Sequence, residues 1–102
     1  MGKNRDRESL IKLIVNTVIH KIVKEHTNRP ESVHFLNSEF IEYRTQSEET
    51  AKKFNWNSED KKFIEEIALK KIKEKLSKKY PDVKYEEQEI TQELKILIKE
   101  IL

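Results

Sequence analysis

The scarcity of glycine is the feature that most restricts what this chain can fold into. The 102 residues include a single glycine, Gly2, so every later turn has to form without one. Tight two-residue β-hairpins usually need glycine at positive φ, which disfavours a sheet built from such hairpins. Charged residues make up 39% of the chain, and most are lysine and glutamate, which are good helix formers. Together these features predict an all-α domain.

Apolar residues recur at helical spacing in four segments of the chain. The pattern predicts helices over residues 8–26, 29–54, 58–79 and 92–102. A break at Asn37–Ser38 would divide the second segment, so we expect a compact bundle of four or five helices. Residues 32–45 also fit a small hairpin, because β-rich stretches flank that break. The alternative fold is therefore α+β.

Polar residues mark the expected ends of two of these helices. Asn57 and Asp60 are spaced as in a capping box and predict a helix start at Ser58. Thr91 is expected to cap the last helix. The basic start of the chain predicts a flexible tail over residues 1–7, which leaves residues 8–102 as a single helical domain.

The apolar residues of these helices define the expected core. The first helix is apolar around most of its circumference, with a narrow polar strip that includes Lys12, Asn16 and His20. A helix of this kind is normally central to a fold or shared with a partner. The predicted core comprises Ile14, Val18, Ile22, Leu36, Phe40, Phe54, Phe63, Ile67, Ile72, Leu94, Leu97, Ile98 and Ile101.

Several kinds of site are disfavoured by what the sequence lacks. There is no cysteine, so disulfides, thiol catalysis and cysteine zinc sites are excluded. His20, His26 and His34 do not have the spacing of three or four that ligands on one helix need, so no metal cofactor is expected. No phosphate-binding glycine loop or nucleophile motif occurs, and we expect neither an enzyme nor a small-molecule ligand.

The apolar runs are short. None exceeds three residues, as in Leu13–Val15, which is far from the length of a membrane span, and no uninterrupted apolar stretch follows the basic start of the chain. We therefore expect no membrane association, no secretory signal and a location in the cytoplasm.

A surplus of apolar residues on the first and last helices favours a role in protein interaction. These residues exceed what a monomer of this length readily buries, so we expect a homo-oligomer or a complex with a protein partner. The residues expected at the interface are Leu10, Ile14, Ile19, Trp56, Ile101 and Leu102.

The distribution of lysine supports a second hypothesis. Residues 61–80 carry eight lysines against three glutamates, and residues 1–7 are also basic. Such a segment is either a solvated helix face or a surface that contacts the phosphate backbone of nucleic acid. On the second interpretation, the contacts are expected at Arg5, Arg7, Lys70, Lys71, Lys75, Lys78 and Lys79.

Overall fold

Four helices make up the fold. The computed structural model describes residues 2–26, 30–81 and 83–102. The helices are α1 (Gly2–His26), α2 (Pro30–Ala51), α3 (Ser58–Lys79) and α4 (Glu87–Ile101), and the described residues include no strand. The prediction of an all-α bundle is confirmed. The hairpin alternative is wrong, because residues 32–45 lie within one unbroken helix, α2.

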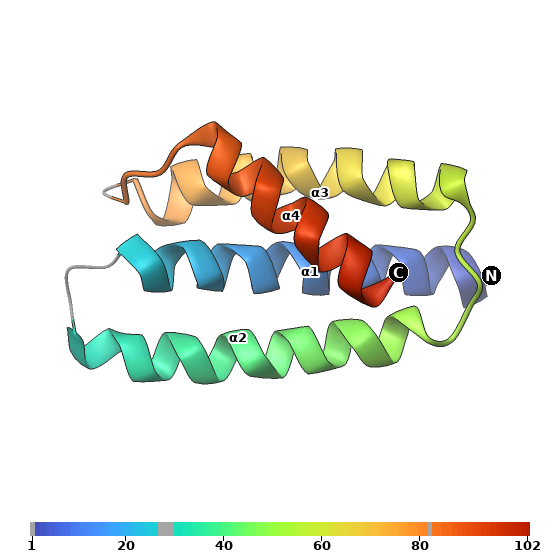
Figure 1. Ribbon diagram of the computed structural model, residues 1–102, viewed down its shortest axis with the longest axis horizontal. Helices are drawn as coiled ribbons and strands as arrows, with labels where there is room; N and C mark the ends of the chain where they lie inside the picture. The colour runs from blue at the N-terminus through green and yellow to red at the C-terminus, as the bar shows by residue number, and fades with distance from the viewer. Residues whose placement is uncertain (1, 27–29, 82) are drawn as a thin grey trace.

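α1 occupies the centre of the bundle. In Figure 1, α2 lies along one side of α1 and runs antiparallel to it, while α3 lies along the other side and runs parallel to it. From the end of α3, the chain turns back, and α4 runs diagonally across the front of α1 in the view of Figure 1. α1 contacts all three other helices, which explains why apolar residues cover most of its circumference.

The start of α3 agrees with the prediction from nearby polar residues, whereas the start of α4 does not. The Asn57 side chain accepts a hydrogen bond from the Asp60 backbone N–H (2.8 Å), and the Asp60 carboxylate accepts one from the Asn57 N–H (3.3 Å), so the predicted capping box is confirmed. Thr91 is not the cap of α4, because the helix begins at Glu87 and the Thr91 hydroxyl bonds to the Glu87 carbonyl inside it. The earlier start brings Ile90 into the core, where it is fully buried.

The start of α1 also differs from the prediction. The helix begins at Gly2, so residues 2–7 are helical where a flexible tail was predicted; Met1 lies outside the described residues. Contacts with the start of α3 hold this first part of α1. The Arg7 guanidinium lies 3.7 Å from the Asp60 carboxylate and 4.3 Å from the centre of the Phe63 ring.

The buried core includes most of the residues predicted for it. Ile14, Val18, Ile22, Leu36, Ile72, Leu94, Leu97 and Ile98 are buried, while Phe40, Phe54, Ile67 and Ile101 are partly buried. Phe63 is the exception, since 41% of it is exposed. Its ring packs under the Arg7 guanidinium at the surface, where a cation above an aromatic face is favourable.

Two polar side chains are also buried, where α1 meets α2. The hydroxyls of Thr17 and Ser47 lie 3.5 Å apart, and each also bonds to a backbone carbonyl one turn earlier in its own helix. These bonds satisfy both hydroxyls, so neither buried side chain leaves a polar atom without a partner. As far as the structure describes the chain, none of its helices has the length and apolar character that a membrane crossing requires.

Candidate nucleic-acid interface

Five lysines gather where α1 and α3 meet the surface. Lys71, Lys75, Lys78 and Lys79 of α3 line one hollow together with Glu74, and Lys12 of α1 lies close enough to Lys75 to repel its charge. We call these five residues (Lys12, Lys71, Lys75, Lys78 and Lys79) the lysine cluster.

Helical periodicity and packing explain the position of the lysine cluster. Ile72 and Leu76 are one turn apart on α3, and both are buried on the side of this helix that packs against the bundle, of which α1 is the centre. Lys75 lies between them in sequence, at the edge of this buried face, and Lys71 and Lys79 are one turn before and after it. The same packing that buries the apolar face of α3 therefore sets a row of lysines against α1.

Lys75 is the central member of the lysine cluster. Its ammonium donates a hydrogen bond to the Asn16 side-chain oxygen of α1 over 3.2 Å. Burial lowers the pKa of Lys75 below its ordinary value of 10.5, and the neighbouring charges of Lys79, Lys12 and Lys71 lower it further. Both causes disfavour the charged form, so holding this ammonium here costs free energy in the folded state.

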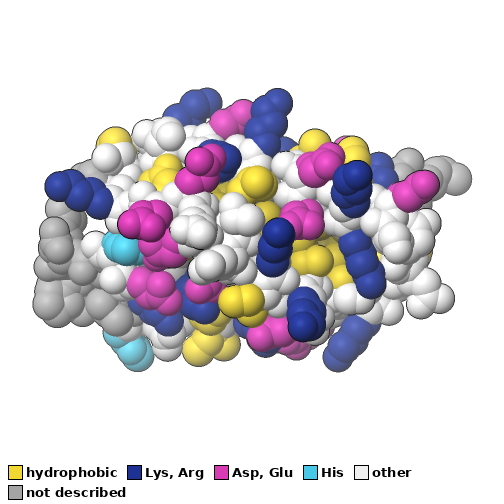
Figure 2. Space-filling view, turned by 45° about the horizontal axis from the view of Figure 1, so that its top comes forward, with side chains coloured by type: hydrophobic (Ala, Val, Ile, Leu, Met, Phe, Trp, Pro, Cys, Tyr) yellow, Lys and Arg dark blue, Asp and Glu magenta, His cyan; other side chains and the backbone are white. Residues whose placement is uncertain are grey.

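In the part of the chain that the structure describes, the lysine cluster shares its lack of ion pairs with other exposed lysines such as Lys62, Lys95 and Lys99. Within the described ranges, no ion pair joins any of its five members to a carboxylate. In contrast, Lys73 pairs with Glu87, and Lys21 pairs with Glu93 at 2.6 Å. The face of α3 and α4 seen in Figure 2 likewise shows basic and acidic side chains interspersed. What distinguishes the lysine cluster is the convergence of its charges, because Lys79, Lys12 and Lys71 all act on the ammonium of Lys75.

The structure separates the basic residues predicted for nucleic-acid contact. It brings Lys71, Lys75, Lys78 and Lys79 together and leaves Lys70 exposed but outside their hollow. Arg7 is engaged with Asp60 and Phe63, as described above, whereas Arg5 is exposed.

Sequence reasoning placed Lys12 on the polar strip of its helix but did not connect it with the α3 lysines. The connection depends on the parallel packing of α1 against α3 (Figure 1). The only sequence signal for it was the polar strip itself, which marks the part of α1 that the bundle leaves uncovered.

The residues predicted for a protein interface have a different environment. Leu10, Ile14 and Ile19 of α1 are at most 3% exposed, because the other helices cover them. Trp56 closes the turn between α2 and α3, and its indole N–H donates to the Ala51 carbonyl at 2.8 Å. Ile101 and Leu102 pack partly against the core. The apolar surplus of α1 is thus used within the chain itself.

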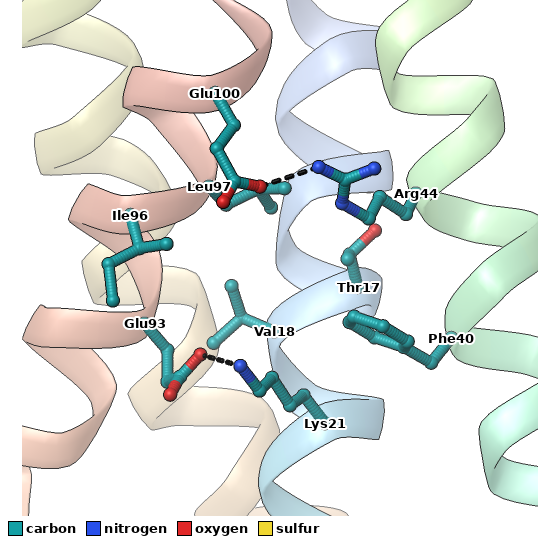
Figure 3. A pocket seen from close by; sticks show the side chains of 9 residues that line it. All are labelled: Thr17, Val18, Lys21, Phe40, Arg44, Glu93, Ile96, Leu97 and Glu100. Atoms are coloured by element: carbon teal, nitrogen blue, oxygen red, sulfur yellow. Dashed lines mark hydrogen bonds and ion pairs between the residues drawn. The ribbon is translucent and has the colours of Figure 1, made fainter.

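A second surface feature is a small cleft between α2 and α4, above α1. Phe40 of α2 and Leu97 of α4 lie on its walls, and Ile96 of α4 stands at its edge with 50% of its surface exposed (Figure 3). We call this feature the α2/α4 cleft.

Two ion pairs line the α2/α4 cleft, one that joins α2 to α4 and one that joins α1 to α4. Arg44 bonds to Glu100 at 2.5 Å, and Lys21 bonds to Glu93 at 2.6 Å (Figure 3). The bond with Glu100 is the largest of the influences that raise the pKa of the Arg44 guanidinium. Sequence reasoning did not find this cleft, because it depends on the angle at which α4 crosses the bundle.

The histidines have structural partners. His20 lies 2.7 Å from the Asn16 carbonyl and packs its ring against Tyr43, while His26 bonds to Glu89 at 2.5 Å. Among the described side chains, no three of His, Asp or Glu converge as a metal site requires.

Known proteins provide no further guide to this surface. No family model, curated protein or solved structure matches the chain.

Proposed function

We propose that this protein binds nucleic acid through phosphate contacts at the lysine cluster. The observation that carries the proposal is the environment of Lys75, a partly buried ammonium that faces three further lysines. A bound phosphate backbone would bring more negative charge to these lysines than Glu74, which also lines their hollow, provides. Relief of the repulsion among these lysines would add to the gain from releasing counterions from the nucleic acid.

The arrangement of the lysines supports a polymer rather than a single phosphate as the ligand. Successive turns of α3 advance by about 5.4 Å, so Lys71, Lys75 and Lys79 form a row of charges along their hollow rather than converging on one point. Arg5 lies two turns before Lys12 on α1 and would extend the charged surface. A row of this kind suits the regularly spaced charges of a nucleic-acid backbone.

The chemistry of lysine predicts binding without sequence preference. An ammonium meets phosphate as a point charge, whereas the bidentate reading of bases or phosphates usually uses arginine. The lysine cluster contains no arginine. We therefore expect contacts that position the backbone and depend strongly on salt, and we expect little discrimination among base sequences.

The test is a fluorescence titration of short duplex DNA and single-stranded RNA between about 50 and 200 mM salt. Wild-type protein is compared with the triple variant Lys71→Gln, Lys75→Gln and Lys79→Gln. Each phosphate contact contributes about 0.7 to 0.9 to the slope of log affinity against log salt, so the variant should reduce the slope by about 2 to 3.

A second triple variant provides the matched control. Lys62→Gln, Lys95→Gln and Lys99→Gln remove the same charge from exposed positions outside the lysine cluster. The control should keep the wild-type slope. If wild-type protein does not bind either probe at the lowest salt, or if both variants lose the same slope, the lysine cluster is not a nucleic-acid site.

A further inference from the structure

Phe63 continues the row of lysines along α3. Phe63, Ile67, Lys71, Lys75 and Lys79 follow one another at intervals of four residues, and each of the first four directly precedes a buried residue of α3. Side chains four residues apart are neighbours on a helix, so this row follows one edge of the buried face of α3. Phe63 is 41% exposed and lies eight residues before Lys71, which is about 12 Å along the helix axis. An exposed aromatic ring therefore stands on the same side of α3 as the lysine cluster.

Arg7 of α1 supports this ring. Its guanidinium lies 4.3 Å from the centre of the Phe63 ring and 3.7 Å from the Asp60 carboxylate. A cation over one face of the ring restricts the ring's position at the surface and leaves the exposed part of Phe63 open to a second contact. Nucleic-acid bases stack on aromatic rings and on the planes of arginine guanidiniums. The pair of Arg7 and Phe63 therefore suits the flat face of a base.

The charges around Phe63 favour a base over a phosphate. Asp60 already balances the charge of Arg7, and Glu66 is an exposed carboxylate three positions after Phe63. Both carboxylates repel phosphate, whereas a neutral base is not repelled. Positive charge is supplied farther along the row, at Lys71 and Lys75. The row thus offers a place for a base at one end and for the backbone at the other.

We propose that the nucleic acid bound at the lysine cluster is single-stranded, and that one of its bases stacks against the exposed part of Phe63. This inference rests on the proposed function and specifies the class of nucleic acid. In a duplex the base faces are covered by their neighbours in the stack, whereas a single strand can turn a base face toward an aromatic side chain. The row from Phe63 to Lys79 covers about 24 Å of α3. A stacked strand advances about 3.4 Å per nucleotide, so a strand of about ten nucleotides reaches both ends.

The test compares a single-stranded RNA of about ten nucleotides with the duplex of the same sequence, by fluorescence titration at about 200 mM salt. Wild-type protein should bind the single strand more tightly than the duplex. Phe63→Ala should weaken single-strand binding by about 5-fold to 150-fold, which corresponds to the loss of one stacked base, and should leave duplex binding unchanged. Because no phosphate contact is lost, the slope of log affinity against log salt should remain that of wild type.

Two variants control for the ring and for its position. Phe63→Tyr keeps an aromatic ring and should keep the wild-type affinity. Phe35→Ala removes a ring that is 62% exposed on α2, a helix that does not pack against α3 within the described residues, and should bind both probes as wild type does. The proposal is overturned if wild-type protein binds the duplex more tightly, or if Phe63→Ala and Phe35→Ala have the same affinity for the single strand.

A spectroscopic measurement reports the stacking itself. Phe63→Trp places an indole on the row, and a base stacked on it should quench its fluorescence when the single-stranded RNA is added. Trp56 is only 9% exposed and bonds to the Ala51 carbonyl, so its emission should change much less. Phe35→Trp is the matched control and should show no added quenching. Equal quenching in the two variants would contradict stacking at Phe63.

The outcomes separate this inference from the proposed function. If wild-type protein binds no nucleic acid, or if the triple variant at Lys71, Lys75 and Lys79 keeps the wild-type salt slope, the proposed function fails. If that variant loses slope while Phe63→Ala binds the single strand as wild type does, the lysine cluster binds nucleic acid and only the stacking inference is overturned.

Discussion

α1 and α3 are helices of nearly equal length, 25 and 22 residues, that differ in how much of their surface the fold buries. α1 packs between α2 and α3 and is crossed by α4. Nine of its residues from Leu10 to Val23 are buried. α3 buries one residue per turn, namely Ile64, Ala68, Ile72 and Leu76. The apolar surplus of α1 therefore reflects its central position, while the free surface of α3 carries the charge available for binding.

The largest effect should come from placing a charge in the centre of α1. Ile14 is fully buried, so Ile14→Glu must either bury an unpaired carboxylate or open the bundle. We expect a loss of about 4 kcal/mol or more in the free energy of unfolding, enough to leave much of the protein unfolded. Urea denaturation followed by the fluorescence of Trp56 measures it. A folded variant with wild-type stability would show that α1 is not the core of the fold.

A smaller loss is expected where α3 approaches α1. Ala68 is fully buried on the face of α3 that packs in the core, so Ala68→Leu adds volume to a site that is already filled. Overpacking of this kind should cost about 1 to 3 kcal/mol, measurable as a lower midpoint of urea denaturation. The exposed neighbour Lys70 supplies the comparison, because Lys70→Leu should change the midpoint very little. Equal effects of the two substitutions would contradict the assigned orientation of α3.

The cap of α3 should contribute less than either core position. Asn57→Ala removes the acceptor for the Asp60 N–H and leaves the first turn without its side-chain cap. We expect a loss of about 1 kcal/mol in the free energy of unfolding. Asn57→Asp keeps an acceptor at the same place and should retain most of the stability. If alanine and aspartate behave alike, the capping box does not stabilise the helix.

The smallest effect, and one of opposite sign, is expected at the lysine cluster. Lys75→Met removes a charge that burial and three lysines disfavour, at the cost of the bond to Asn16. The free energy of unfolding should stay constant or rise by up to about 1 kcal/mol, while binding to nucleic acid weakens. A variant that loses both stability and binding would indicate that Lys75 has a structural role only.

The pH dependence of this variant follows from the sign of the pKa shift. The folded-state pKa of Lys75 lies below its ordinary value of 10.5, so the unfolded chain binds more protons in the interval between the two values. The penalty is therefore complete below the folded-state pKa and disappears as the pH rises toward 10.5. Any stability advantage of Lys75→Met should shrink over the same interval, which urea denaturation at several pH values would detect.

The parts of the fold that sequence reasoning predicted are those set by nearby residues. The start of α3 follows from Asn57 and Asp60, which lie at the first turn of the helix. The start of α4 was placed too late, at Thr91, although Ile90 lies four residues before Leu94 and so shares the buried face of that helix. The helical start of α1 was missed for a different reason, since Arg7 is held by residues of α3 that are distant in sequence.

The candidate sites likewise include features that nearby residues predict and features that depend on the packing of helices. The four-residue spacing of Lys71, Lys75 and Lys79 is enough to place them on one side of α3, whereas Lys70, which was also predicted to contact nucleic acid, lies outside their hollow. The contribution of Lys12 and the α2/α4 cleft depend on how separate helices pack against one another. A hydrophobic pattern shows that a helix has an apolar face, but it does not specify which neighbour covers that face or at what angle.

The most direct test of nucleic-acid binding follows the lysine side chains by NMR while a short single-stranded RNA is added. We expect the largest chemical-shift changes at Lys71, Lys75 and Lys79, together with the side-chain amide of Asn16 that bonds to Lys75. The pKa of Lys75 should rise on binding, because a phosphate favours its charged form. Larger changes at Lys95 and Lys99 of α4, or an unchanged Lys75 in the presence of RNA, would contradict the account.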